Sequence, residues 1–237
     1  MDPKEVCLKN KKFAAIVLAG GRGTRMKSDV PKQYLEIKGK PVLYYALKAF
    51  QDSAVDTIVL VTGKEEISYC KEHIVEKYGL SKVRAVVEGG SERYYSVFNG
   101  LKQILEYDYV LIHDGARPFV TQNIIYENMR QVVSKKACVT GVPSKDTVKL
   151  VDEQNIVAST PDRSRVWIIQ TPQTFETDLV YKAYETVLSG EHSGITDDAM
   201  VVEAAVNRPV HMVMGDYRNI KITTPEDLAV AQVFASE

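Results

Sequence analysis

Short apolar runs alternate along the chain with longer stretches whose apolar positions recur at helical spacing. The short runs are expected to be strands buried on both faces, and they cover residues 13–18, 57–62, 83–87 and 109–113. The longer stretches are expected to be helices, and they cover residues 41–50, 65–78 and 92–106. This alternation predicts an α/β fold in which helices cover both faces of a mostly parallel sheet.

The pattern changes after Val142. Two extended segments, 145–159 and 166–175, flank a polar turn and predict a hairpin-like arm over residues 145–175. The elements expected beyond the arm are helices at 178–188 and 198–205, strands at 210–214 and 219–223, and a helix from Pro225. The predicted fold class is therefore α/β, a Rossmann-like three-layer αβα sandwich with a mostly parallel sheet and a protruding β-arm.

Composition narrows the class of protein. The length and apolar content suit one globular domain over residues 1–237, with residues 1–12 as a flexible extension. Thirty basic and 31 acidic side chains give a formal charge of −1, which argues against a general binder of nucleic acid or of membrane surfaces. The three cysteines form no CxxC pair, and no apolar run is long enough to cross a bilayer. A cytoplasmic location is expected.

Three polar loops follow the expected strands directly, and they begin at Ala19, Gly89 and Asp114. In open parallel sheets, ligands bind beyond the carboxyl ends of the strands. We therefore expect these three loops to gather around one ligand site.

The first loop, AGGRGTR at 19–25, is rich in glycine but fits neither of two common phosphate-binding motifs. A P-loop requires glycine, and a dinucleotide fingerprint requires glycine or alanine, where this chain has Met26. Glycines still let backbone N–H groups approach a phosphate closely, and Arg25 and Lys32 add charge that suits a triphosphate. The alternative is a glycine-rich turn with solvated cations. The candidate nucleotide-binding residues of this loop are Ala19, Gly20, Gly21 and Gly23.

Further motifs follow in a fixed order. They are GGSERYYSV at 89–97, HDGARP at 113–118, KDTVK at 145–149, TPDR at 160–163, QTPQ at 170–173, TDDA at 196–199 and NIKIT at 219–223. Together with LAGGRGTRM and PKQY, they resemble the sugar-nucleotidyltransferase superfamily, and within it the 2-C-methyl-D-erythritol 4-phosphate cytidylyltransferase family. The resemblance extends from Phe13 to the last expected helix.

Two other functions are compatible with some of these motifs. Ribitol-5-phosphate cytidylyltransferases share the glycine loop, PKQ and QTPQ, and the double glycine Gly20-Gly21 is common among them. DRSRVW at 162–167 and TDDA at 196–199 instead look like the methylerythritol form. The third function is that of a non-catalytic nucleotide-binding protein, against which the presence of both Arg25 and Lys32 argues.

The resemblance implies a reaction in which CMP passes from CTP to 2-C-methyl-D-erythritol 4-phosphate and pyrophosphate is released, a step of the non-mevalonate isoprenoid pathway. The attacking phosphate is already anionic, so positioning and charge neutralisation are the main requirements. The implied catalytic residues are Arg25, Lys32, Arg163 and Lys221. The implied cofactor is Mg2+, with Asp114 as its candidate ligand.

The resemblance also assigns contacts to both substrates. Implied nucleotide-binding residues in the second and third loops are Gly90, Ser91, Arg93, Ser96, Asp114 and Gly115. Implied contacts to the second substrate are Arg117, Thr147 and Thr171. Several of these residues have an alternative, purely structural role. Asp114 and Gly115 would form an ordinary turn, Arg117 would only brace Asp114, and Ser91 would cap a helix.

The expected arm carries an apolar stretch, VWII at 166–169, that has no evident partner within one chain. A two-fold dimer whose arms clasp each other would bury these side chains. We therefore expect a homodimer, in which Arg163 of one arm serves the site of the other chain.

Overall fold

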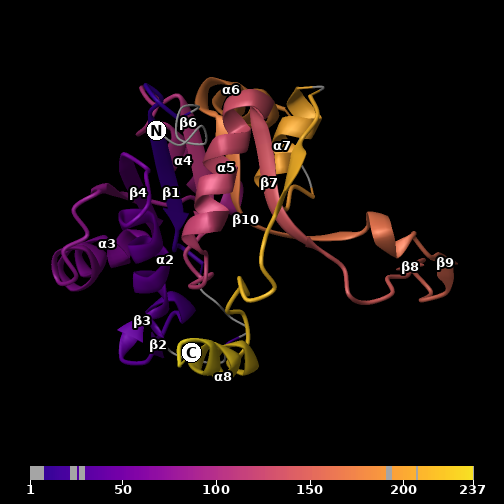
Figure 1. The fold of residues 1–237 in the computed structure, drawn as a ribbon, viewed down its shortest axis with the longest axis horizontal. Helices are drawn as coiled ribbons and strands as arrows, with labels where there is room; N and C mark the ends of the chain where they lie inside the picture. Colours follow the sequence, from indigo (N-terminus) through magenta and orange to yellow (C-terminus); the bar gives the residue numbers. More distant parts are fainter. Residues whose placement is uncertain (1–7, 22–25, 27–29, 191–193, 207, 237) are drawn as a thin grey trace.

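The computed structural model describes residues 8–21, 26, 30–190, 194–206 and 208–236. A seven-stranded sheet forms its centre, in the order β11-β7-β10-β6-β1-β4-β5 (Figure 1). The strands are β1 (Phe13–Leu18), β4 (Thr57–Thr62), β5 (Val83–Glu88), β6 (Tyr109–Asp114), β7 (Ala137–Pro143), β10 (Trp167–Glu176) and β11 (His211–Met214). Neighbouring strands are parallel, apart from β10, which runs antiparallel to β6 and β7. The predicted α/β class with a mostly parallel sheet is confirmed.

Helices cover both faces of the sheet, as expected. The helices are α2 (Val42–Gln51), α3 (Ile67–Tyr69), α4 (Arg93–Leu101), α5 (Gln122–Lys135), α6 (Thr177–Leu188), α7 (Asp198–Ala205) and α8 (Pro225–Phe234). Alternate side chains of β1 enter different cores: Ala15 and Val17 pack with α2 and α5, whereas Ala14 and Ile16 pack with α4 and α6. Within the described ranges, no helix is long and apolar enough to cross a membrane.

Several expected elements have different bounds in the structure. The helix expected at 65–78 is three short pieces: a 3₁₀ turn η3 (Lys64–Glu66), α3, and a π-helical η4 (Cys70–Glu76). The helix expected at 92–106 ends at Leu101. The strand expected at 219–223 is wrong, because Ile222 N–H donates to the loop carbonyl of Ala116 instead of joining the sheet.

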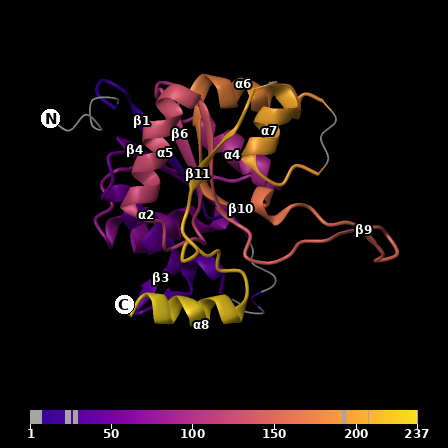
Figure 2. The ribbon, with the colours of Figure 1, turned by 45° about the vertical axis from the view of Figure 1, so that its right-hand side comes forward.

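The arm is shorter than the expected 145–175. Residues 144–166 leave the sheet and project from the body, with a small hairpin of β8 (Leu150–Val151) and β9 (Val157–Ser159) (Figures 1 and 2). The segment expected to complete the arm is mostly β10, whose residues 173–176 pair with β6 inside the main sheet. A 3₁₀ turn η5 (Arg163–Arg165) links the hairpin to β10.

The C-terminal helix lies across the amino-terminal part of the chain. A small hairpin of β2 (Glu36–Ile37) and β3 (Lys40–Pro41) is held by Gln232 of α8, which donates to Glu36 O at 2.8 Å and accepts from Lys38 N at 3.1 Å. Of the expected N-terminal extension, residues 8–12 form a turn in which Leu8 packs against the core.

Candidate active site

A cavity of about 750 Å³ opens at the carboxyl ends of the central strands. The sequence-predicted residues that line it are Ala19, Gly20, Gly21, Lys32, Gly90, Ser91, Arg93, Ser96, Asp114 and Lys221. Strand register explains the meeting of the loops, because Leu18 of β1 lies beside Asp114 of β6, and Thr62 of β4 lies beside Glu88 of β5. The expected gathering of the three loops is confirmed.

Other predicted residues lie elsewhere. Gly23 and Arg25 fall outside the described residues. The predicted residues that do not line the cavity are Gly115, Arg117, Thr147, Arg163 and Thr171. Gly115, Arg117 and Thr171 lie behind the cavity wall, whereas Thr147 and Arg163 lie on the arm.

The start of the first loop is fixed by a glutamine that the sequence analysis did not single out. Gln33 is buried, and its side-chain amide donates to Ala19 O at 2.6 Å. Ala19 N–H donates to Val61 O at 2.7 Å, so the start of the loop is fixed on both sides. Gln33 follows Lys32 in the 3₁₀ turn η2 (Lys32–Tyr34), so the same turn supports the loop and carries the candidate phosphate-binding lysine.

The second loop packs tightly on the start of α4. A Cβ atom at Gly90 would lie 2.2 Å from Tyr95 Cβ, so only glycine fits there. Ser96 Oγ accepts from Gly90 N–H at 3.0 Å and donates to Glu92 O at 3.2 Å. The N-cap of α4 is Glu92, so Ser91 is not the helix cap that one alternative required.

Asp114 lies among three cations at the edge of the cavity. Its carboxylate is 2.8 Å from Lys221 Nζ, 3.6 Å from Arg93 Nε and 3.9 Å from Arg117 Nε. Burial alone would raise the pKa of Asp114, but Arg93, Lys221 and Arg117 outweigh it and hold that pKa well below its usual range. Asp114 is therefore a fixed anion that orients Lys221 toward the cavity.

Beneath Asp114, a buried pair of side chains fixes the end of β6. Thr171 Oγ1 accepts from Asp114 N–H at 3.1 Å and lies 3.0 Å from His113 Nδ1. Burial lowers the pKa of His113 to about 4, so the ring is neutral near pH 7 and Nε2 can donate to Arg117 O at 3.1 Å. Thr171 is thus placed to support Asp114, and its predicted contact with the second substrate stays a prediction.

Arg117 braces the segment that carries Lys221. Its guanidinium donates to Asn219 O at 2.7 Å and to Ile169 O at 3.4 Å, and its side chain is only 11% exposed. The Asn219 amide in turn donates to Thr171 O at 2.9 Å. The predicted alternatives for Arg117, a contact with the second substrate or a brace for Asp114 alone, both stay predictions. Gly115 has a packing role, because a Cβ there would lie 2.8 Å from Leu43 Cδ1.

Arg93 forms a two-pronged ion pair with Asp198 of α7, a partner that the sequence analysis left without a role. Both guanidinium–carboxylate contacts are 2.7 Å long, and Tyr184 OH donates to the same carboxylate at 2.6 Å. Burial opposes the charge of Arg93, but Asp198 and Asp114 outweigh it and hold the pKa of Arg93 well above its usual value. This pair ties α7 to the cavity wall.

We expect Asp198→Asn to lower the free energy of unfolding by roughly 2–4 kcal/mol, because a mostly buried arginine would lose its counter-charge. The matched control is Asp178→Asn, whose carboxylate is exposed and lies 3.9 Å from Lys182 Nζ. We expect Asp178→Asn to lower the free energy of unfolding by less than about 0.5 kcal/mol. Urea unfolding of the three proteins measures both values, and equal losses would contradict the assigned importance of the Arg93 pair.

The arm residues stand apart from this cavity. Thr147 and Arg163 are exposed, and the Arg163 guanidinium makes a long contact with its own arm, 3.5 Å from Nη1 to Lys145 O. Their predicted contacts with the second substrate therefore require another chain's site or a moved arm.

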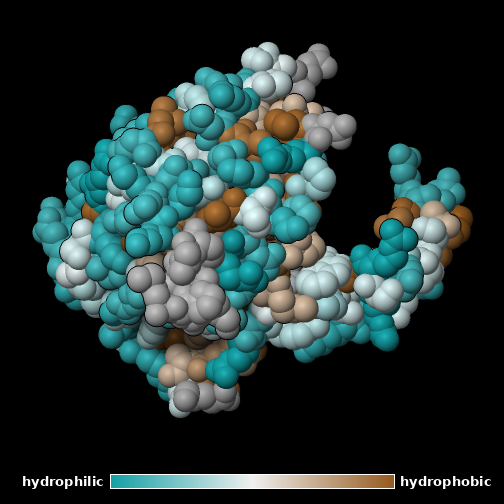
Figure 3. Space-filling model, turned by 45° about the horizontal axis from the view of Figure 1, so that its top comes forward, coloured by the Kyte–Doolittle hydropathy of each residue, from teal (hydrophilic) through white to brown (hydrophobic). Residues whose placement is uncertain are grey.

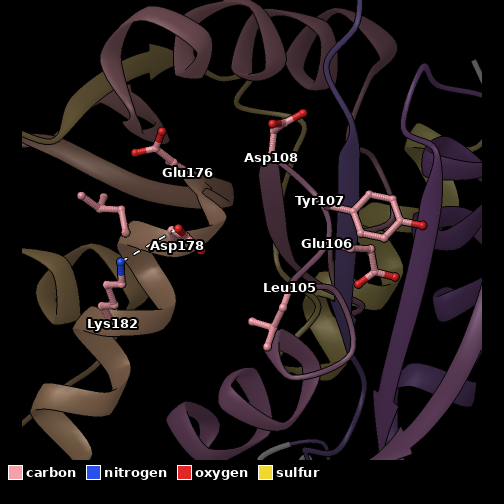
Figure 4. A pocket seen from close by; sticks show the side chains of 8 residues that line it. Leu105, Glu106, Tyr107, Asp108, Glu176, Asp178 and Lys182 are labelled. Atoms are coloured by element: carbon pink, nitrogen blue, oxygen red, sulfur yellow. Dashed lines mark ion pairs between the residues drawn. The ribbon is translucent and has the colours of Figure 1, made fainter.

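A second hollow, of about 520 Å³, lies at the opposite edge of the sheet, where β6 begins (Figure 4). Its carboxylates have partners: Glu176 pairs with Lys136 at 2.6 Å, and Asp108 accepts from Lys12 N–H at 2.8 Å. Four carboxylates and a single lysine line this hollow, and ligands of such sheets bind at the opposite, carboxyl ends of the strands, so the hollow does not suit an anionic nucleotide. No cluster of three or more metal-ligating side chains occurs in the described part of the chain.

Comparison with known proteins agrees with this geometry. A family model described as 2-C-methyl-D-erythritol 4-phosphate cytidylyltransferase (IspD) matches residues 13–237. The protein of that name from Lachnoclostridium phytofermentans is 55% identical over 227 residues, which are 96% of this chain and 97% of the relative. The one from Caldanaerobacter subterraneus is 48% identical and covers 93% of this chain and 97% of its own.

Solved structures give the same result. The 4-diphosphocytidyl-2C-methyl-D-erythritol synthase of Anaerococcus prevotii superposes with a TM-score of 0.86 at 35% identity, covering 98% of this chain and 99% of its own. The Francisella tularensis enzyme gives 0.76 at 30% identity, with 94% and 99% covered. These matches favour the methylerythritol branch over the ribitol branch and an enzyme over a non-catalytic binder. The chain belongs to the 2-C-methyl-D-erythritol 4-phosphate cytidylyltransferase family.

Proposed function

We propose that this chain transfers CMP from CTP to 2-C-methyl-D-erythritol 4-phosphate in the cavity between β1 and β6. The observation that carries the proposal is the charge arrangement of the cavity, with the glycine loop and Lys32 in one wall and Lys221 held by Asp114 in another. Two anionic substrates must meet in this reaction, and cations fixed before binding lower the electrostatic cost of their approach.

In the proposed reaction, a phosphate oxygen of the second substrate attacks the α-phosphorus of CTP, and pyrophosphate leaves. The nucleophile is an anion at neutral pH, so no side chain has to remove a proton. Lys32 and Arg25 would bind the triphosphate and offset the charge that develops on the leaving pyrophosphate. Lys221 would hold the incoming phosphate, and its ion pair with Asp114 keeps it in place before the substrates arrive.

We propose that the loop at 89–96 receives the cytosine. Two contacts hold the loop close to its surroundings: Gly90 lies against α4, and Gly89 N–H donates to Thr62 O at 2.8 Å. We propose that a loop held in this way accepts one ring and excludes two. We therefore expect CTP to be strongly preferred over ATP and GTP, with discrimination from UTP set by hydrogen bonds to the base edge.

The assay is pyrophosphate release by the purified protein with each of four nucleoside triphosphates and with either methylerythritol phosphate or ribitol phosphate. We expect release with CTP and methylerythritol phosphate only. Equal rates with purine nucleotides would contradict the base site. Activity with ribitol phosphate alone would overturn the proposed second substrate, and no release with any pair would overturn the proposed function.

We also propose Mg2+ as the cofactor. Asp114 lines the cavity and has the oxygen donors that Mg2+ prefers, but three cations share its carboxylate. An ion here would depend on phosphate oxygens of CTP and on water for most of its ligands, as Mg2+ commonly does in nucleotide sites. When bound, it would neutralise charge on the triphosphate.

Finally, we propose a homodimer formed through the arm. Apolar side chains are exposed on the arm, at Leu150, Val151, Ile156 and Val157, and on the adjoining start of β10, at Ile168 and Ile169. Figure 3 shows apolar atoms on the arm where it stands clear of the body. Exposed apolar groups on a projecting hairpin favour burial against a second copy, and a two-fold contact would bury both arms at once.

A further inference from the structure

A cluster of side chains lies behind the cavity wall and takes no part in the chemistry proposed above. Its centre is Glu66 Oε2, which accepts from Thr62 Oγ1 at 2.8 Å, from Tyr34 OH at 3.1 Å and from Gly63 N–H at 3.2 Å. Cys70 Sγ lies 3.1 Å from the Tyr34 hydroxyl. One carboxylate oxygen therefore accepts hydrogen bonds from two separate parts of the chain, the 3₁₀ turn at Tyr34 and the end of β4 at Thr62 and Gly63.

These donors come from the parts that shape the cavity. Thr62 and Gly63 line it at the end of β4, and Thr62 O also accepts from Gly89 N–H of the base loop at 2.8 Å. Tyr34 is the last residue of the 3₁₀ turn η2, which begins at Lys32. The cluster thus joins the turn that carries the phosphate-binding lysine to the strand end that supports the base loop.

The turn η2 is fixed at both of its remaining side chains. Gln33 donates to Ala19 O at 2.6 Å, and Tyr34 reaches Glu66 on the other side while its ring packs edge-on against Tyr69 at 5.0 Å. Burial raises the pKa of the Tyr34 hydroxyl far above its usual value, so the group stays protonated and can donate. Because the two residues that follow Lys32 in the turn are both anchored, these contacts restrict the backbone position of Lys32.

We propose that Glu66 and Tyr34 are positioning residues that hold Lys32 against the triphosphate of CTP; the inference rests on the role proposed above for Lys32. Loss of the Tyr34 hydroxyl would free one end of the turn. The Lys32 amine would then lie beside the triphosphate of CTP for a smaller fraction of the time. A group that acts through Lys32 can have no effect once the Lys32 amine is gone.

The test is a double-mutant cycle with Tyr34→Phe and Lys32→Ala, measured as kcat/KM for CTP. Tyr34→Phe removes only a hydroxyl, and we expect it to lower this value about five- to tenfold in the natural chain and less than about twofold in the Lys32→Ala background. The KM for the second substrate should not change. Glu66→Gln, which keeps one acceptor oxygen, should act in the same direction and be better tolerated than Glu66→Ala.

The matched control is Tyr45→Phe, because the Tyr45 hydroxyl also donates a hydrogen bond, here to the backbone carbonyl of Ile37 at 2.6 Å, and does so away from the cavity. It should change thermal stability about as much as Tyr34→Phe and leave activity unaltered. An equal loss from Tyr34→Phe in both backgrounds, or no loss in either, would overturn the positioning role. If Lys32→Ala alone were fully active, the proposed function of Lys32 would fail instead, so the two failures are distinguishable.

Discussion

Lys32→Ala should lower kcat by about 10²–10³-fold, the scale seen when an enzyme loses one donor to transition-state charge. Lys32 lines the cavity and belongs to a turn anchored by its neighbour Gln33, so its charge is held in place rather than recruited by the substrate. We expect Arg25→Ala to lower kcat by a similar factor, because the sequence places Arg25 in the glycine loop that is proposed to bind the triphosphate. Because the lost stabilisation belongs mainly to the transition state, kcat should fall more than KM for CTP rises.

The control for Lys32→Ala is Lys48→Ala on α2. The Lys48 side chain is 44% exposed and pairs with Asp52 at the end of the same helix, so its loss should leave turnover within about twofold of the natural chain. Steady-state pyrophosphate release at saturating second substrate measures all three variants. Near-normal turnover in both Lys32→Ala and Arg25→Ala would remove this part of the cavity from the mechanism.

The sequence predicts the sheet well where a strand is buried on both faces. The runs at 13–18 and 57–62 are mainly apolar, as strands with a neighbour on each side and a helix layer on each face require, and β1 and β4 have those bounds. Prediction is poorer where a segment is held by partners far along the chain. Residues 219–223 look like a strand, but the Asn219 side chain donates to Thr171 O within β10 and Ile222 N–H donates to Ala116 O of a loop, and only the fold brings these carbonyls near.

The candidate site shows the same division. Loop positions follow from strand ends, so the gathering of Gly20, Gly90 and Asp114 was predictable from topology alone. The partners of these residues were not. Arg93 and Asp198 are 105 residues apart, and no local pattern marks them as a pair. Gln33 supports the first loop through a single side-chain contact, which spacing cannot reveal.

Met26 illustrates why a failed motif can be informative. It stands where a P-loop or a dinucleotide fingerprint requires a smaller residue, and it is 5% exposed in a core cluster with Ile37, Val42 and Ile222. Ala231 of α8 belongs to the same cluster, and Ile222 is the residue that follows Lys221. The position is therefore used for anchoring in this fold, which accounts for its departure from both motifs.

The second large effect is expected in a mixed dimer, in which one chain carries Arg163→Ala and the other carries Lys32→Ala. Arg163→Ala and Lys32→Ala should each be nearly inactive as homodimers, whereas a dimer with one chain of each should recover about half of the natural activity. If Arg163 of one arm grips the methylerythritol phosphate at the other chain's cavity, one of the two sites then contains both intact residues. Arginine suits this task because its guanidinium can hold a phosphate with two parallel hydrogen bonds.

The structure favours a role for Arg163 outside its own chain's cavity, since it is exposed on an arm that projects from the body and does not line the cavity (Figure 2). The experiment co-expresses the two variants with different tags, isolates the heterodimer and measures pyrophosphate release. Arg165→Ala, two residues along the same 3₁₀ turn, is the matched control and should be nearly fully active on its own. A heterodimer as inactive as its two parents would mean that Arg163 serves its own chain or no site, and the exchange of arms between sites would be wrong.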